Sequence, residues 1–281
     1  MSTVNFCGTN SHGEQGRPFL KWPGGKRWLA NKIISKIAPR LANRYFEPFL
    51  GGGAVFFMLQ PDNATLSDIN PDLINVYRQV RDKPEALLER IKRRKVTKEN
   101  YYRIREQHIH HPLQRAVRFL YLNRTAFGGI YRLNRRGQFN VPYGGGQRTP
   151  SCLWEQELIK AASRALKGKT LLVSDFEEVM EKARNGDVVY CDPTYTVAHE
   201  NNGFLRYNEK NFSWEDQKRL ASAARRAVRH GATVIVSNAF DRSLLDLYWP
   251  SKPVVYVRNS LVSPNPAERR QVRECLFILK K

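Results

Sequence analysis

Residues 188–195 combine a strand pattern with groups that could do chemistry: they read Val-Val-Tyr-Cys-Asp-Pro-Thr-Tyr. The short apolar run, bounded by a turn signal, predicts a buried strand of a parallel sheet. Ligands of open α/β sheets bind outside the carboxyl ends of the strands, so we expect Asp192, Pro193 and Tyr195 in a pocket. An acid, a rigid main-chain carbonyl and a flat ring would then lie close together. The other motifs of the chain indicate which reaction these groups could serve.

A glycine-rich turn follows a second predicted strand. The stretch 45–53 ends in Gly51-Gly52-Gly53 and leads into a predicted helix at 54–59. This layout is typical of a cofactor loop, because glycines let a ligand approach the backbone and the helix N-terminus faces it. An ordinary tight strand–helix turn is the alternative. The next strand, 64–68, ends in Asp68, which is a candidate ribose ligand unless Asp68 or Asn70 only caps the following helix.

The charge of the chain predicts a polyanionic partner. The formal net charge is +21 and the isoelectric point is near 10.1. Residues 107–154 contain seven arginines, no lysine and no acidic residue. Arginine without lysine favours planar recognition of phosphates and bases over simple solubility. Nucleic acid is the partner that this pattern indicates.

Composition limits the class of protein. The 281 residues, 41% of them hydrophobic, suffice for one large α/β domain or a domain with a sizeable insertion. No apolar run reaches 18 residues and the N-terminus lacks a signal region, so we expect no membrane partner. The four cysteines form no CxxC pair, which argues against zinc or disulfides and fits the cytoplasm.

Helices and strands are expected to alternate on both sides of a basic segment. Residues 1–16 read as a disordered arm. The segment 78–148 carries 18 lysines and arginines against five acidic residues, and alternating residues around Arg136-Gly137 predict a β-hairpin. Such a ribbon fits the major groove, where an arginine can pair with guanine. Further strands are expected at 170–173, 232–237, 254–258 and 272–279, and helices at 27–37, 71–80, 84–107, 113–122, 153–165, 213–230 and 241–248.

Six motifs in one order resemble the Dam family of DNA adenine-N6 methyltransferases, over residues 19 to about 279. The resemblance implies an α/β, Rossmann-like methyltransferase sheet, mostly parallel with an antiparallel C-terminal hairpin, and a helical and β-hairpin insertion for DNA recognition. The implied division is a catalytic domain at 17–77 and 150–281 and a target-recognition domain at 78–149. The motifs are Phe19-Leu20-Lys21-Trp22-x-Gly-Gly-Lys26, Glu47-Pro48-Phe49-x-Gly51-x-Gly53, Ser67-Asp68-Ile69-Asn70, Asn123-Arg124-Thr125, Gly137-x-Phe139-Asn140-Val141-Pro142 and Tyr190-Cys191-Asp192-Pro193-x-Tyr195.

The implied reaction gives the opening stretch a role. Adenine N6 is a poor nucleophile because its lone pair is delocalised into the ring. The Asp192 carboxylate and the Pro193 carbonyl would accept its two hydrogens, and Tyr195 would stack on the base. The adenine must leave the duplex to reach this pocket. Transfer of the methyl group of S-adenosylmethionine needs positioning and no metal.

The resemblance also implies binding residues, which together suggest a GATC-like target in double-stranded DNA. Arg132 would read guanine, Phe127 would insert into the base stack, and Arg124, Asn134 and Asn140 would contact phosphates. Lys21, Ile130 and Pro142 would contact further bases. The implied cofactor residues are Trp22, Lys26, Phe49, Gly51, Gly53, Asp68, Asp175, Phe176 and Asp192.

Two positions depart from the family pattern: Thr194 replaces a second proline, and Gly128 replaces an amide. Thr194 restores an N–H group and loosens the backbone. A catalytically impaired DNA-binding relative and a cytosine-N4 methyltransferase therefore stay open as alternatives. An RNA substrate is less compatible, because A-form RNA hides the major groove. We expect a bacterial or phage protein that acts as a monomer on DNA, either alone or in a restriction-modification pair.

Overall fold

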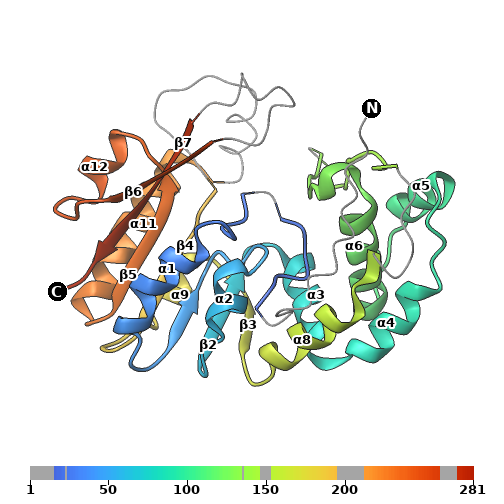
Figure 1. The fold of residues 1–281 in the computed structure, drawn as a ribbon, viewed down its shortest axis with the longest axis horizontal. Coiled ribbons are helices and arrows are strands. Elements are labelled where there is room, and N and C mark those ends of the chain that lie inside the picture. Colours follow the sequence, from blue (N-terminus) through green and yellow to red (C-terminus); the bar gives the residue numbers. More distant parts are fainter. Residues whose placement is uncertain (1–15, 23, 135, 146–152, 195–211, 260–270) are drawn as a thin grey trace. The chain divides into compact units, whose positions relative to one another are not determined.

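The computed structural model describes residues 16–22, 24–134, 136–145, 153–194, 212–259 and 271–281 (Figure 1). The predicted arm at 1–16 falls almost wholly outside them, as does Tyr195. The chain divides into two compact units. We call them the helical unit (Met1–Asn31, Gly51–Gln60 and Asn70–Leu171) and the sheet unit (Lys32–Leu50, Pro61–Ile69 and Leu172–Lys281). These bounds group the glycine turn with the helical segment, and the predicted domain division stays a prediction.

A seven-stranded sheet runs through the described residues in the order β3-β2-β1-β4-β5-β7-β6. Strands β1, β2, β4 and β5 pair in parallel, and β7 pairs antiparallel with both β5 and β6. The predicted mostly parallel sheet with an antiparallel C-terminal hairpin is therefore confirmed. The strands are β1 Tyr45–Glu47, β2 Ala64–Asp68, β3 Thr170–Val173, β4 Val188–Cys191, β5 Thr233–Ala239, β6 Val254–Asn259 and β7 Gln271–Leu279.

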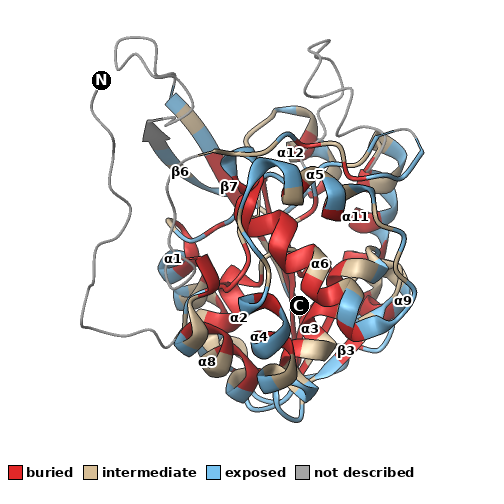
Figure 2. Cartoon of the chain, turned by 90° about the vertical axis from the view of Figure 1, so that its right-hand side faces the viewer, coloured by how far each residue is buried: buried red, intermediate tan, exposed pale blue. Residues whose placement is uncertain are grey.

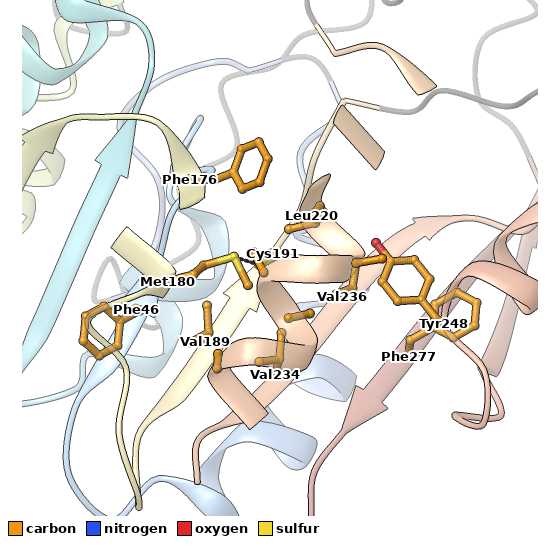
Figure 3. Packing of buried hydrophobic residues seen from close by; sticks show 14 of the residues in the cluster. Phe46, Phe176, Met180, Val189, Cys191, Leu220, Val234, Val236, Tyr248 and Phe277 are labelled. Carbon is orange, nitrogen blue, oxygen red and sulfur yellow. Dashed lines mark hydrogen bonds between the residues drawn. The ribbon is translucent and has the colours of Figure 1, made fainter. Parts of the chain in front are cut away.

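Apolar side chains on one face of the central strands make the core of the sheet unit (Figure 3). Val189 and Cys191 of β4 and Val234 and Val236 of β5 alternate toward the same layer, as the two-residue period of a strand requires. Helices α9 (Phe176–Met180) and α11 (Trp214–Arg229) contribute to this core, as does the residue following α12 (Ser243–Leu247), Tyr248. Helix α1 (Ala30–Ile37) starts three residues later than expected.

Local capping signals set where several helices begin. Asn70 caps α3 (Pro71–Asp82): its Oδ1 accepts the N–H groups of Asp72 and Leu73 at 3.0 and 3.2 Å. Ser213 and Asp216 form the predicted start of α11 as a reciprocal capping box. Asn70, rather than Asp68, therefore performs the capping that was the alternative to a ligand role for Asp68.

The helical unit packs α3 against α6 (Pro112–Thr125) and α8 (Gln156–Leu166). The helical pattern expected at 84–107 forms two helices, α4 (Pro84–Lys92) and α5 (Lys98–Glu106), and Thr97 caps the second. Figure 2 shows the buried residues in the interior and the exposed residues on the outward turns of the helices. Within the described residues, no helix is long and apolar enough to cross a membrane.

Candidate active site

The carboxyl end of β4 presents Asp192, and the neighbouring strand β5 holds it. Parallel pairing aligns Cys191 with Val236, so Asp192 comes level with Ser237. The Ser237 hydroxyl donates to Asp192 Oδ1 at 2.8 Å, and the hydroxyls of Tyr190 and Ser237 lie 3.0 Å apart. Tyr190 and Ser237 are buried. The carboxylate that the sequence predicts as catalytic thus has a fixed hydrogen-bond partner.

The rest of the predicted catalytic motif is partly described. Pro193 is buried, whereas Thr194 is exposed. Tyr195 lies outside the described residues. Because the Thr194 side chain points to solvent, its replacement of a proline changes no packing within the described structure.

Three predicted cofactor residues meet at the ends of neighbouring strands. The Phe49 ring stacks on Phe176 with centroids 5.2 Å apart, and Asp68 ends β2. The Leu50 N–H donates to the carbonyl of Ser67 at 2.9 Å, which joins the turn after β1 to the end of β2. The Ser174 N–H donates to the Asp68 carbonyl at 3.4 Å. These main-chain contacts join the segments that carry Phe49, Asp68 and Phe176 at the carboxyl edge of the sheet.

Asp175 and Phe176 lie under a charge network from α11. The Asp175 carboxylate caps α9 by accepting the Glu177 N–H at 3.0 Å, and it pairs with Arg219 at 2.9 Å. The Arg219 guanidinium lies 4.9 Å from the centre of the Phe176 ring. Burial by itself would raise the pKa of the Glu177 carboxyl. Hydrogen bonds from Arg226 and Arg219 outweigh burial, so the pKa of Glu177 is lowered. The Asp175 carboxylate is therefore engaged, and its role toward a cofactor remains a prediction.

The glycine turn requires its glycines for two reasons. Gly51 and Gly53 have φ of +47° and +67°, a region that disfavours side chains. A Cβ atom on Gly51 would come within 2.9 Å of Trp22 Nε1, and one on Gly53 within 3.0 Å of the Tyr77 hydroxyl. Lys26 is buried and its Nζ donates to the Gly24 carbonyl at 3.4 Å. The helical unit thus packs Trp22 directly on the turn that the sequence assigns to the cofactor.

The predicted hairpin is present as a turn with isolated bridges instead of regular strands. Leu133 pairs with Phe139, and the Asn134 N–H donates to the Gln138 carbonyl at 2.8 Å. Asn134 Oδ1 accepts two main-chain N–H groups of the turn. The exposed Arg132 donates from Nε to Asn140 Oδ1 at 2.9 Å. This hydrogen bond holds the predicted guanine reader beside a predicted phosphate contact.

The segment before the hairpin exposes apolar side chains. Phe127 is 60% exposed and Ile130 is 40% exposed. Gly128 and Gly129, with φ of +62° and +66°, form the turn between them. The structure brings Lys21 to the same place: its N–H donates to Asn123 Oδ1 at 3.0 Å, and its side chain packs on Gly129. Pro142 accepts the Phe127 N–H at 2.9 Å.

Arg124 does not fit its predicted phosphate role. Only 5% of it is exposed, and it donates to Glu155 and to the Phe19 carbonyl. Burial lowers its pKa, while Glu155 offsets part of that effect. Because a buried, paired guanidinium cannot reach a DNA backbone, Arg124 serves the packing of the helical unit.

A cleft of about 750 Å³ opens within the helical unit between the α5–α6 connection and the hairpin. Arg118 donates from Nε to the Ile104 carbonyl at 2.9 Å, and Arg115 pairs with Asp72. Arg105 donates to the Val141 carbonyl at 3.4 Å. Cations and imidazoles outnumber carboxylates in the lining, which includes Asp72, Arg105, Glu106, His108, His110, Arg115, Arg118, Asn134 and Asn140.

Sequence reasoning missed Ser237, Tyr190 and this cleft as parts of a site. Ser237 lies in a strand whose sequence is typical of a buried core strand, and Tyr190 stands in the catalytic motif without a predicted role. The signal available was a polar residue at the carboxyl end of an apolar strand, which is where sheet ligands bind.

Comparison with known proteins identifies the family of the chain. Residues 22–265 match the family model of the D12 class N6 adenine-specific DNA methyltransferase. The type II methyltransferase M1.LlaDCHI of Lactococcus lactis subsp. cremoris is 39% identical over 83% of this chain and 84% of its own. The DNA adenine methylase of Escherichia coli K12 is 34% identical over 95% and 96%. Among solved structures, the putative methyltransferase yhhF of Escherichia coli aligns with a TM-score of 0.36, at 11% identity over 93% of this chain and 91% of that one. The family model and the curated relatives show that the chain belongs to the D12 class of N6 adenine-specific DNA methyltransferases.

Proposed function

We propose that the protein methylates N6 of an adenine flipped out of double-stranded DNA, with S-adenosylmethionine as the methyl donor, within GATC or a related site. The observation that carries the proposal is the Asp192 carboxylate, held by Ser237 at the carboxyl end of β4. Beside it along the chain, the buried Pro193 supplies a second acceptor in its carbonyl.

The residues of the sheet unit fit the donor. The partly exposed Phe49 ring, stacked on the buried Phe176, is proposed to meet the adenine ring, and Asp68 offers a carboxylate to a ribose diol. Gly51 and Gly53, in the turn after β1 that belongs to the helical unit, are proposed as further contacts of the donor. S-adenosylmethionine supplies an activated methyl group on a sulfonium. Trp22, Lys26 and Asp175 are further proposed contacts.

Asp192 and Pro193 would act on the target amino group. Accepting its two hydrogens favours a pyramidal nitrogen with a directed lone pair. An ionised carboxylate accepts more strongly than a neutral group. Tyr195 is proposed to stack on the base, and extrusion of the adenine is required because N6 cannot react inside the duplex.

The helical unit offers a surface suited to DNA. Arg132 stands on the turn as an exposed planar donor for guanine, and Phe127 is an exposed ring that can enter a base step. Lys21, Ile130 and Pro142 are proposed as further base contacts, and Asn134 and Asn140 as phosphate contacts. Arg105, which lines the cleft, is proposed to extend the basic surface toward the phosphates of the DNA backbone.

The test is methylation of unmodified DNA by the purified full chain. We expect methyl transfer that depends on S-adenosylmethionine, N6-methyladenine as the modified base by mass spectrometry, and protection from nucleases that cut unmethylated GATC. Asp192→Asn should lose at least about 1,000-fold in rate, because it removes the charged acceptor. N4-methylcytosine as product, or equal negligible transfer by both forms, would contradict the proposal. Methylated adenine outside GATC would correct only the target sequence.

A further inference from the structure

Two buried hydroxyls lie behind the proposed catalytic carboxylate. Tyr190 is 1% exposed and Ser237 is fully buried. They come from neighbouring parallel strands, and their oxygens are 3.0 Å apart. Ser237 Oγ lies 2.8 Å from Asp192 Oδ1 and 3.4 Å from the Cys191 carbonyl, so the carboxylate is its closer acceptor.

The directions of these hydrogen bonds follow from counting protons. An ionised carboxylate can only accept, and a serine hydroxyl has a single proton. When Ser237 donates that proton to Asp192, only Tyr190 can supply the proton between the two hydroxyls. Burial raises the pKa of Tyr190 well above its usual range, and the charge of Asp192 raises it further, so Tyr190 keeps its proton. The chain of donors therefore runs from Tyr190 through Ser237 to Asp192.

We propose that Tyr190 and Ser237 are positioning residues that fix the orientation of the Asp192 carboxylate for the amino group of the target base. The proposal rests on the proposed adenine-N6 transfer. The torsion that rotates a carboxylate is broad in an aspartate, so the side chain alone does not hold an oxygen in place. A hydrogen bond to Oδ1 from a residue buried in the sheet restricts that rotation. Each donor in the chain also polarises the next.

A buried tyrosine hydroxyl is usually paired, so a control is needed that separates positioning of Asp192 from pairing for stability alone. The same unit buries the Tyr248 hydroxyl completely, and no hydrogen-bond partner for it exists among the described residues. This fold therefore tolerates a buried tyrosine hydroxyl without a partner. Tyr248 serves as a matched control, because Tyr248→Phe removes a buried hydroxyl of the same kind from the same unit.

The experiment measures single-turnover methyl transfer, KM for DNA and for S-adenosylmethionine, and thermal stability in the full chain. We expect Ser237→Ala to lower the transfer rate about 10- to 100-fold with both KM values within about twofold, because only the reacting geometry suffers. Tyr190→Phe should lower it about three- to tenfold, and should add nothing in the Ser237→Ala background, since Tyr190 acts through Ser237. Ser237→Thr keeps the hydroxyl and should recover most of the rate.

Several results would overturn this assignment. Unchanged transfer rates in Ser237→Ala and Tyr190→Phe would overturn the positioning role and leave the proposed reaction intact. A loss of rate in Tyr248→Phe equal to that in Tyr190→Phe would also overturn it, as would losses that multiply independently in the double variant. If Ser237→Ala fails to fold, the nearly isosteric Tyr190→Phe gives the decision by itself. A wild-type chain that transfers no methyl group would overturn the proposed reaction and this role together.

Discussion

Individual side chains of the helical unit are exposed where contact with DNA is proposed. Phe127 stands on a turn made by two glycines in the left-handed region, and most of its ring is exposed. The backbone conformation thus keeps this ring away from the core, where it would otherwise pack.

We predict that Phe127→Ala lowers kcat/KM for DNA about tenfold or more, because an inserting ring offsets part of the cost of unstacking a base step. The midpoint of thermal unfolding should not change, since an exposed ring contributes little packing. Steady-state kinetics with variable DNA and a melting curve check both statements. Trp249→Ala, at a side chain 71% exposed with no predicted DNA role, is the control. Equal kinetics for the two variants would remove Phe127 from the interface.

At the scale of elements, turns and caps decide where the site residues lie. The hairpin turn depends on Gly137, which has φ of +73° and no atom within 4 Å of the position that a Cβ atom would take. Strain there comes from the backbone alone, because an added Cβ meets nothing.

Gly137→Ala should therefore weaken site-specific DNA binding about three- to tenfold, from roughly 1 kcal/mol of left-handed backbone strain that shifts Arg132 and Asn140. Gly137→Asn should lose less, since asparagine tolerates that conformation. Affinities for cognate and non-cognate duplexes, measured by fluorescence anisotropy, separate the two variants. Identical behaviour of alanine and asparagine would mean that backbone strain is not the cause.

Helix α11 depends on its capping box, which pairs Ser213 and Asp216 reciprocally. Ser213→Ala should reduce the free energy of unfolding by about 1 kcal/mol, because it leaves an N–H at the helix start unsatisfied. Urea unfolding followed by circular dichroism measures this change. Ser222→Ala, at an exposed position inside the same helix, should instead be neutral or slightly stabilising. A larger loss from Ser222→Ala than from Ser213→Ala would contradict the capping argument.

At the scale of the whole molecule, net charge governs encounter with DNA. A chain with a net charge of +21 gains affinity by releasing counterions from the phosphate backbone. This contribution does not depend on sequence, and it falls steeply as salt rises. Specificity requires contacts to base edges, which are proposed for side chains of the hairpin.

We predict that non-cognate affinity falls by about a thousandfold or more between 50 and 200 mM salt, as expected for six or more phosphate contacts. Arg105→Ala, in the cleft, should reduce the slope of log affinity against log salt by about one. Arg229→Ala, on α11, removes the same charge from a helix with no predicted DNA contact and should leave the slope unchanged. A salt titration that shows equal slopes for all three proteins would exclude the cleft from the interface.

The sequence by itself determined the elements and the order of the motifs, because both rest on local information. The sheet class, the capping box of α11, the limits of α2 (Ala54–Leu59) and the place of Asp192 after a buried strand follow from period, capping residues and glycines close along the chain. The helical pattern at 84–107 divides into two helices, because the Thr97 side chain caps a new helix start within it.

Only the tertiary structure decided which distant groups meet. It joined Ser237 to Asp192 across 45 positions, buried Arg124 against Glu155, and engaged Asp175 with Arg219. These contacts depend on which strands pair and in which register, and that is settled by burial of a whole face at once. A local pattern indicates which chemistry a residue can do, whereas the register of the sheet determines which residue lies beside it.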